Sequence, residues 1–386
     1  MPADINSLLE KAVSMKASDL HIRAGTYPVV RVNGVLTALA GEERLSPEDT
    51  SAIAQMVMDE PHKEGFSKEL DIDVSYSVPG LGRFRCNCFM QRGTVAIVFR
   101  VIPLKILALE DLYLPDILKK VALEPRGMIL VTGTTGSGKT TTLSSMIDYI
   151  NSNKTDNVIT IEDPVEFLHR DKKSIISQRE IGNDAVSFAK ALRAALRQDP
   201  DVILVGEMRD FETIKTALDA AETGHLVLST LHTIDAVETI NRIISVFPPY
   251  QQSQVRAQLA SVLKAIISMR LVQRADQKGV VPAVEVLIAT ATIKGCIEDP
   301  EKTKNINDHI AEGGSQYGMQ TFDQSLLHLY KSELITYESA VSIATNPDDF
   351  ALKVKGIQST SDAWSSGGMS DDSEGESGPE IERFSR

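Results

Sequence analysis

The segment Gly133–Thr140 limits the possible folds of this chain more than any other part of the sequence. Its sequence GTTGSGKT has the spacing G-x-x-x-x-G-K-T and follows the apolar run MILVT. A buried strand that ends in such a loop, followed by residues that can begin a helix, is the context of a phosphate-binding loop, the Walker A motif. The sequence therefore predicts a nucleotide site within an α/β fold.

The residue types in this loop suit the binding of phosphate. Gly133, Gly136 and Gly138 permit positive φ angles and close backbone approach, so successive N–H groups can converge on phosphate oxygens at the positive end of the following helix. Lys139 is expected to reach the β- and γ-phosphates of ATP, and the Thr140 hydroxyl is expected to bind Mg²⁺. The predicted nucleotide-binding residues are Gly133, Thr134, Thr135, Gly136, Ser137, Gly138, Lys139, Thr140 and Thr141.

The chain around this loop alternates helices with short, continuously apolar strands, a pattern typical of a parallel sheet buried on both faces. The four predicted strands are residues 128–132, 158–161, 202–205 and 226–229. Polar side chains follow each of these strands at once. Because ligands of such sheets bind at the carboxyl ends of the strands, we expect the four polar segments to meet at one nucleotide.

Two of these polar segments carry acidic candidates. Glu162 and Asp163 follow the second strand, where a carboxylate can orient or deprotonate the water that attacks the γ-phosphate. Glu207 follows the third strand, which resembles a Walker B strand except that Gly206 stands where a metal-binding aspartate is usual. Glu207 is therefore predicted to serve the Mg²⁺ shell, water activation or both. The structural alternatives are an acidic turn start at Glu162–Asp163 and a surface glutamate at 207.

The overall charge argues against a nucleic acid as the main substrate. The chain has 386 residues and a formal net charge of −13, which repels phosphate polymers and anionic lipid headgroups. No apolar run approaches the length of a membrane span, and the N-terminus lacks the basic and hydrophobic regions of a signal peptide. Its 3 cysteines are too few for a disulfide framework or a four-thiolate zinc site. We therefore expect a cytoplasmic protein without direct membrane insertion.

The pattern of elements changes along the chain and predicts two domains. Helices and alternating, antiparallel strands predict an α+β domain over residues 1–102, and prolines mark a linker over 103–115. Residues 116–355 form the predicted ATPase domain with a helical C-terminal part, and this domain includes an amphipathic helix with an apolar stripe over Val255–Ile267. Residues 356–386 are acidic and rich in Ser and Gly, which predicts a disordered or partner-binding tail.

Four sequence boxes together resemble the type IV pilus retraction ATPases, within the type II/IV secretion ATPase superfamily. The boxes are the phosphate-binding loop, the acidic box IEDPVE at 161–166, the run LRQDPD at 196–201 that continues to GEMRD at 206–210, and a histidine box with GHLV at 224–227 and TLHT at 230–233. The resemblance covers about residues 5–355.

This resemblance implies a fold and a cellular function. The fold is a PAS-like N-terminal domain followed by a RecA-like P-loop domain with a mainly parallel sheet, and the two domains move against each other in a homohexameric ring as ATP turns over. The function is a motor that drives pilus retraction and twitching motility. The implied partners are an inner-membrane platform protein and paralogous pilus ATPases, which place the motor on the cytoplasmic side of that membrane.

The resemblance also implies roles for particular side chains. Glu162 and Glu207 match the acidic-box and Walker B glutamates; either is a candidate for the catalytic base, and Glu162 is favoured. His225 and His232 match the histidine box, which senses the γ-phosphate, whereas a core histidine and a turn histidine are the simpler interpretation without the neighbouring boxes. The matching arginines are Arg193 and Arg209 of the motor domain and Arg85 and Arg100 of the N-terminal domain.

Arginines have a clear physical use at such a site. A guanidinium that reaches the phosphoryl oxygens in the transition state contributes roughly 10³–10⁵ in rate. If Arg85 or Arg100 reaches the nucleotide only when the two domains close, hydrolysis and domain motion become one event. For a strand arginine considered alone, a solvated face or a surface ion pair is the simpler interpretation.

One segment departs from the family pattern. Retraction ATPases of this kind carry a segment of the type AIRNLIRE where this chain has TIKGCIED at 292–299, which keeps the apolar positions but loses the second arginine. Two alternatives to a retraction motor therefore stay open: an assembly or secretion ATPase of the same superfamily, and an ATP-gated scaffold at the pilus base. The former resemble longer chains with an added N-terminal domain, and intact Lys139, Glu162 and Glu207 favour an active, Mg²⁺-dependent ATPase over a scaffold.

Overall fold

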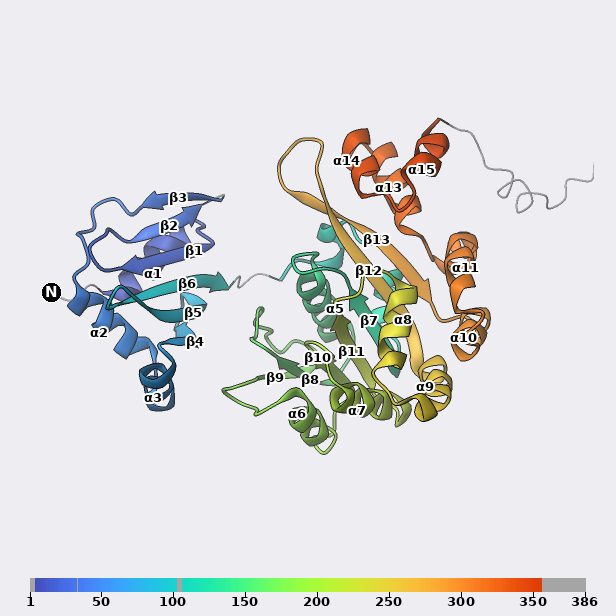
Figure 1. Ribbon diagram of the computed structural model, residues 1–386, viewed down its shortest axis with the longest axis horizontal. Coiled ribbons are helices and arrows are strands. Elements are labelled where there is room, and N and C mark those ends of the chain that lie inside the picture. Colours follow the sequence, from blue (N-terminus) through green and yellow to red (C-terminus); the bar gives the residue numbers. More distant parts are fainter. Residues whose placement is uncertain (1–3, 33, 103–105, 356–386) are drawn as a thin grey trace, which may run out of the picture.

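Two β-sheets organise the chain, one formed by strands that precede residue 103 and the other by strands that follow residue 126 (Figure 1). The structure is a computed structural model and describes residues 4–32, 34–102 and 106–355. The predicted tail over 356–386 lies outside the described residues. No helix within the described ranges is long and apolar enough to span a membrane.

The first sheet is antiparallel throughout and has the strand order β3-β2-β1-β6-β5-β4. Its strands are β1 (Asp19–Arg23), β2 (Val29–Val32), β3 (Val35–Ala38), β4 (Asp71–Val78), β5 (Gly82–Gln91) and β6 (Thr94–Ile102). The helices of this part are α1 (Ile5–Ser14), α2 (Pro47–Val57) and α3 (Glu60–Glu69). The combination of helices and antiparallel strands agrees with the prediction from sequence alternation.

One face of the first sheet packs against helices and the other carries polar side chains. Phe84, Cys86 and Cys88 of β5 are buried with apolar residues of α1 and α2. Since successive side chains of a strand point to opposite faces, Arg83 and Arg85 lie on the other face. Cys86 and Cys88 are therefore packing residues.

The second sheet is mixed and has the strand order β13-β12-β7-β11-β10-β8-β9. Its strands are β7 (Gly127–Thr132), β8 (Asn157–Glu162), β9 (Ile175–Glu180), β10 (Val202–Val205), β11 (Leu226–Leu231), β12 (Leu263–Gln273) and β13 (Val280–Ile288). All neighbouring strands run parallel except β12 and β13, which form an antiparallel pair. The four strands predicted from apolar runs are β7, β8, β10 and β11, and the structure confirms each of them.

Helices cover both faces of the second sheet, because the side chains of its buried strands alternate between two apolar clusters. Met128 and Leu130 of β7 pack with helices α6 to α10, whereas Ile129 and Val131 pack with α4 and α5. These helices are α4 (Ile117–Ala122), α5 (Lys139–Asn153), α6 (Phe188–Ala195), α7 (Phe211–Glu222), α8 (Ala236–Ser245), α9 (Pro249–Val262) and α10 (Ala291–Glu298).

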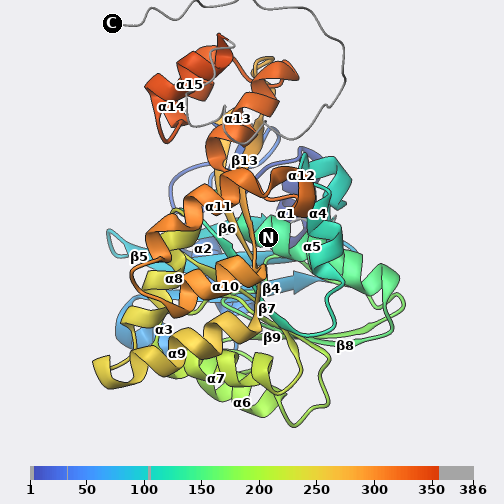
Figure 2. The same cartoon turned by 90° about the vertical axis from the view of Figure 1, so that its right-hand side faces the viewer.

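The C-terminal helices pack against the β12–β13 hairpin, and α13, α14 and α15 form a group beyond the main body of the second sheet (Figure 2). Their bounds are α11 (Ile306–Glu312), α12 (Gly314–Tyr317), α13 (Phe322–Lys331), α14 (Tyr337–Ile343) and α15 (Pro347–Val354), preceded by the short 3₁₀ helix η2 (Thr303–Asn305). Phe322 and Phe350 are buried in this group, and the Arg270 guanidinium of β12 lies 3.9 Å from the centre of the Phe322 ring. The predicted helical C-terminal part is therefore present.

The prediction of one amphipathic helix over Val255–Ile267 is wrong in its second half. Helix α9 ends at Val262, and β12 begins at Leu263 and runs parallel to β7. A strand that is buried on both faces is continuously apolar, so a short apolar run fits a helical stripe and a central strand equally well. Pairing with β7 decides between them, since Ile266 lies opposite Leu130. Strands β9 and β13 were also not predicted from the sequence.

The segment that joins the two sheets is packed onto the second sheet's helices wherever it is described. From residue 106 it forms the 3₁₀ helix η1 (Leu109–Leu112), in which Leu109 is buried. The Ser145 hydroxyl of α5 donates to the Leu107 carbonyl at 2.7 Å. Residues 103–105 of the predicted linker lie outside the described residues.

Candidate nucleotide site

The loop between β7 and α5 has the conformation that its glycines predict. Gly133, Gly136 and Gly138 have φ angles of +142°, +79° and +96°. A Cβ atom on Gly133 would lie 2.5 Å from the Met269 carbonyl oxygen and 2.5 Å from the Ser137 hydroxyl, so no side chain fits there. Gly138 caps the N-terminus of α5, whose first-turn N–H groups therefore face the loop.

Lys139 lies over this loop with its ammonium group partly enclosed. The residue is only 8% exposed, and its Nζ donates to the carbonyl oxygens of Gly133 at 2.8 Å and Thr134 at 2.9 Å. Burial lowers the pKa of Lys139, whereas the negative charges of Glu207 and Glu166 act in the opposite direction. Backbone oxygens thus hold the ammonium group at the phosphate loop, and the negative charges of Glu207 and Glu166 favour its charged form.

A cavity of about 550 Å³ opens beside the loop, a size that suits a small-molecule ligand. Most of the residues that line it lie at or after the ends of β7, β8, β10 and β11, as the argument from parallel strands predicts. Phe188 of α6 and Leu271 of β12 complete the wall. Of the predicted site residues, those lining it are Thr135, Gly136, Gly138, Lys139, Thr140, Thr141, Glu162, Glu207, Arg209 and His232. Gly133, Thr134 and Ser137 shape the loop without lining the cavity.

Glu162 is a buried carboxylate at the end of β8. It is 6% exposed, and its Oε1 accepts hydrogen bonds from the Thr160 hydroxyl at 2.6 Å and from the Gln178 amide at 3.1 Å. Burial raises the pKa of Glu162, and the hydrogen bonds from Thr160 and Gln178 lower it. A carboxylate with a raised pKa, held in place by donors at a cavity wall, has the properties of a general base.

A cluster of one acidic and two basic side chains lies across the cavity from Glu162, formed by Glu207, Arg209 and His232. The Arg209 Nε lies 2.6 Å from Glu207 Oε1, and the His232 Nε2 lies 3.6 Å from Glu207 Oε2. The side chain of Glu207 is 19% exposed, whereas that of Arg209 is 72% exposed. Because most of the Arg209 side chain is in contact with solvent, Arg209 is free to move toward a ligand.

The donor set at the cavity fits a magnesium ion that arrives with a nucleotide. The described residues contain no group of three or more His, Cys, Asp or Glu side chains arranged to hold a metal by themselves. Thr140 and Glu207 nevertheless both line the cavity. Mg²⁺ is usually bound by one or two protein oxygens together with phosphates and water rather than by a protein cage, and this arrangement matches that mode.

Four of the predicted catalytic residues do not line this cavity, namely His225, Arg193, Arg85 and Arg100. His225 precedes β11, and its Nδ1 lies 2.9 Å from the Ala220 carbonyl oxygen, whereas His232 follows the same strand. A strand of six residues rises roughly 20 Å, so His225 and His232 lie at opposite ends of β11. Arg193 of α6 forms an ion pair with Glu212 of α7 instead.

Arg85 and Arg100 lie on the first sheet, on the neighbouring strands β5 and β6. Arg85 pairs with Asp73 at 3.1 Å, and Arg100 pairs with Asp19 at 3.0 Å. Their predicted contact with a nucleotide stays a prediction. The arginine of β5 that does contact the second sheet's part of the chain is Arg83, which forms an ion pair with Glu180 of β9.

A smaller pocket of about 250 Å³ adjoins the cavity and was not foreseen from the sequence. It shares Gly138, Thr141 and Leu271 with the cavity. The rest of its wall is mostly apolar and includes Leu107, Leu112, Tyr113, Leu114, Met269, Val280 and Pro282. Part of this wall belongs to the segment predicted as a linker, so only the packing of that segment on α5 and β12 creates the pocket.

Comparison with known proteins yields several similar chains. The profile of the family described as "Type II/IV secretion system protein" matches residues 1–321. The chain is 44% identical over 347 residues to the "Type IV pilus retractation ATPase PilT" of Pseudomonas aeruginosa, which covers 90% of this chain and 100% of that protein. It is 41% identical over 360 residues to the "Type IV pilus ATPase PilU" of the same organism, with 93% of each chain covered. The solved "Crystal Structure of the Pilus Retraction Motor PilT and Bound ADP" has 47% identity and a TM-score of 0.84, and it covers 90% of this chain and 98% of the other.

Proposed function

Because the chain belongs to the family of type II/IV secretion system proteins, we infer its function from the retraction ATPases of that family and from its own cavity. It is an ATPase that drives the retraction of type IV pili. The observation that carries this conclusion is the 44% identity over the full length of a pilus retraction ATPase. The cavity at the phosphate loop supports it, since the similar retraction motor holds ADP.

We propose that residues 133–141 bind the phosphates of ATP and that Glu162 is the base. The loop N–H groups and the N-terminus of α5 provide the anion site. Lys139 exchanges its bonds to the Gly133 and Thr134 carbonyls for bonds to phosphate oxygens. Glu162, oriented by Thr160 and Gln178, accepts a proton from the attacking water.

Thr140 and Glu207 would hold Mg²⁺ together with the phosphates. When bound, the ion neutralises developing charge on the phosphoryl oxygens. Arg209 and His232 border the same cavity, and we propose that they contact the γ-phosphate or Glu207 as hydrolysis proceeds. The catalytic roles of Arg193 and His225 stay predictions, since neither side chain lines the cavity.

The apolar pocket beside the cavity is the proposed site of the nucleotide base. It continues from Gly138 and Thr141, where the phosphate loop ends, and most of its wall is apolar. Tyr113 lies at its edge, and the Tyr113 hydroxyl accepts a hydrogen bond from Arg274 at 3.0 Å. A flat aromatic base fits between such side chains, because burial of its faces is favourable.

The finer organisation is also a proposal. The all-antiparallel first sheet supports a PAS-like domain over residues 1–102, followed by a linker over 103–115 and a RecA-like domain over 116–355. We propose a homohexamer on the cytoplasmic side of the inner membrane that acts on a platform protein of the pilus machine, alongside paralogous pilus ATPases. In this ring Arg85 and Arg100 would face a nucleotide.

Two measurements test this function. The purified chain is expected to hydrolyse ATP in the presence of Mg²⁺, and Lys139→Ala and Glu162→Gln are expected to abolish most of that turnover. Deletion of the protein in its host is expected to increase the number of surface pili and to stop twitching. Cells without pili would instead indicate an assembly ATPase, and unchanged hydrolysis in both variants would exclude the proposed site.

A further inference from the structure

The loop that follows β8 begins with the acidic residues of the cavity but has no regular structure of its own. Residues 163–174 contain no helix or strand, and within the described chain no backbone–backbone hydrogen bond joins two residues of 163–172. Three of its members, Asp163, Pro164 and Glu166, line the cavity. Something other than backbone pairing must therefore hold this wall of the site in position.

Two side chains of β9 hold the loop. The Gln178 side chain donates to the Phe167 carbonyl and accepts from the His169 N–H, both at 2.8 Å. Glu180 accepts from the Val165 N–H at 3.0 Å through its Oε2. Glu180 also lies opposite Glu162 in the parallel pairing of β8 and β9. These two alternate residues of an edge strand hold the part of the loop between Val165 and His169, whereas Asn151 of α5 holds Arg170 and Lys172.

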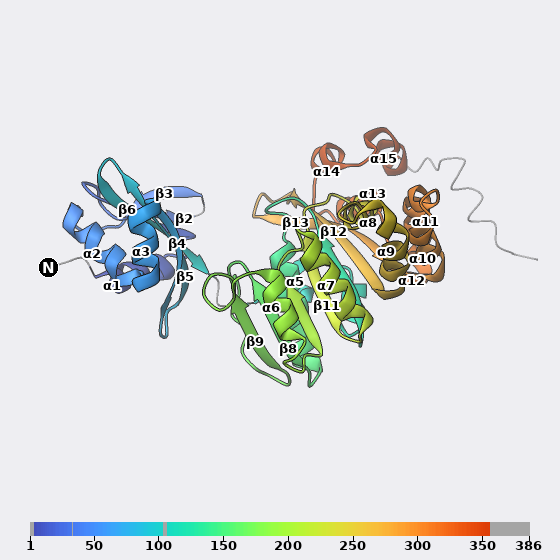
Figure 3. The same cartoon turned by 60° about the horizontal axis from the view of Figure 1, so that its bottom comes forward.

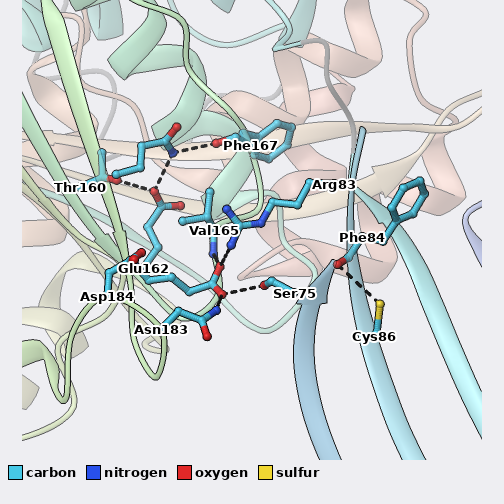
Figure 4. A network of polar contacts seen from close by, with 12 residues as sticks. Ser75, Arg83, Phe84, Cys86, Thr160, Glu162, Val165, Phe167, Asn183 and Asp184 are labelled. Atoms are coloured by element: carbon cyan, nitrogen blue, oxygen red, sulfur yellow. Dashed lines mark hydrogen bonds and ion pairs between the residues drawn. The ribbon is translucent and has the colours of Figure 1, made fainter. Parts of the chain in front are cut away.

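Only one of these two side chains also reaches the first sheet. Glu180 is 3% exposed, and its carboxylate forms an ion pair with Arg83 of β5 and accepts from the Ser75 hydroxyl of β4 at 2.6 Å. Figure 4 shows Arg83, Ser75 and the Val165 N–H directed toward one carboxyl group, and their hydrogen bonds identify it as that of Glu180. Strand β9 is the edge of the second sheet, on the side of the first sheet (Figure 3).

The burial of this ion pair makes it a strong constraint. The side chains of Arg83 and Glu180 are 18% and 4% exposed, whereas those of the neighbouring Arg85–Asp73 pair are 43% and 53% exposed. Removing one member of a buried pair leaves an uncompensated charge, so the remaining side chain changes its orientation or its hydration. Loss of Arg83 is therefore expected to disturb Glu180, and through it the Val165 N–H.

We propose that Glu180 is a positioning residue for ATP hydrolysis and that Arg83 and Ser75 of the first sheet set its orientation. Neither Glu180 nor Arg83 lines the cavity, so both act through the loop that follows Glu162 and not by contact with the nucleotide. The first sheet thereby contributes to the position of the acidic wall through one carboxylate, which also accepts a hydrogen bond from the Asn183 amide on its own side. This inference rests on the proposed ATPase site and adds a coupling between the two sheets.

The test compares Arg83→Met, Glu180→Gln and the double variant with the wild-type full-length chain. Glutamine at 180 keeps an acceptor for one N–H but loses the charge that pairs with Arg83. Each variant is expected to lower kcat by about tenfold, because misplacement of catalytic groups by a fraction of an ångström is costly, while KM and nucleotide affinity change by less than about twofold. The double variant is expected to be no slower than Glu180→Gln, because each single change already removes the same Arg83–Glu180 ion pair.

A structural readout accompanies the kinetics. Hydrogen exchange at the Val165 amide is expected to be faster in Arg83→Met than in the wild type, because its acceptor is no longer fixed. Lys11→Met is the matched control, since Lys11 pairs with Glu42 within the first sheet's part of the chain; its kcat and its Val165 exchange are expected to match the wild type.

The outcomes separate this inference from the proposed function. A wild type that hydrolyses ATP no faster than Lys139→Ala would overturn the function itself. An active wild type with unchanged kcat in Arg83→Met and Glu180→Gln, or with unchanged Val165 exchange in Arg83→Met, would overturn the positioning role alone. Loss of nucleotide affinity in step with kcat would likewise contradict it, because the carboxylate lies outside the cavity.

Discussion

Replacing Thr160 with valine tests which carboxylate accepts the proton of the attacking water. Thr160 is fully buried in β8, and its hydroxyl donates to Glu162 Oε1 at 2.6 Å. Burial raises the pKa of Glu162, and this hydrogen bond is one of the contacts that lower it. Valine is similar to threonine in shape but has no hydroxyl, so the variant keeps the burial and removes one donor.

The expected shift follows from the energy of that bond. A hydrogen bond to a charged group contributes about 1.5–3 kcal/mol, and one pKa unit corresponds to about 1.4 kcal/mol. Loss of this donor destabilises the ionised carboxylate by about that energy, so the pKa of Glu162 is expected to rise in Thr160→Val. A base acts only when deprotonated, so activity is lost as the pH falls through its pKa, and the acid limb of the profile moves to higher pH.

The assay is the pH dependence of kcat/KM for ATP, which reports the pKa values of the free enzyme. Well above the pKa, Thr160→Val is expected to keep activity within a few-fold of the wild type. Thr50→Val is the matched control, because Thr50 is a buried threonine of α2 whose hydroxyl donates to the Pro47 carbonyl. An acid limb that stays in place in Thr160→Val would refute the assignment of Glu162 and favour Glu207 as the base.

Three further predictions concern stability and nucleotide binding. Glu285 of β13 is buried, and burial raises its pKa from 4.5 to about 7; the folded state therefore holds a proton that the unfolded state loses, and stability falls as the pH rises from about 4.5 to 7. Glu285→Gln is expected to remove this dependence and to be more stable at pH 8 by up to about 3 kcal/mol, measured as the pH dependence of denaturant unfolding against the wild type. Gly133→Ala is expected to lower Tm by at least about 5 °C more than Gly80→Ala. Both glycines have positive φ angles, but of the two added Cβ atoms only the one at 133 would collide with other atoms. Equal Tm values of the two variants in thermal unfolding would contradict the described loop. Tyr113→Ala is expected to raise KM for ATP several-fold with little change in kcat, and steady-state kinetics with an unchanged KM would exclude the adjoining pocket as the base site.

The sequence was sufficient for those parts of the site that are local in the chain. The glycines and lysine of the phosphate loop, the four apolar runs and the acidic residues after them were each predicted from a short segment. Their convergence followed from one general rule, that the carboxyl ends of parallel strands share an edge. The separation of His225 from His232 could also be predicted from the sequence. The predicted strand over 226–229 lies between them, and the rise of a strand places them at its opposite ends.

The tertiary structure alone decided what depends on pairing between distant segments. Residues 263–273 are a strand because β7 accepts them as a partner, and a continuous apolar run does not distinguish that outcome from a helix. Arg83 and not Arg85 contacts Glu180, because the way the two sheets meet determines which arginine of β5 lies against β9. Local sequence determines the backbone conformation and which side chains of a strand share a face. The contact between Arg83 and Glu180, which are 97 positions apart in the chain, exists only once the sheets have formed and packed.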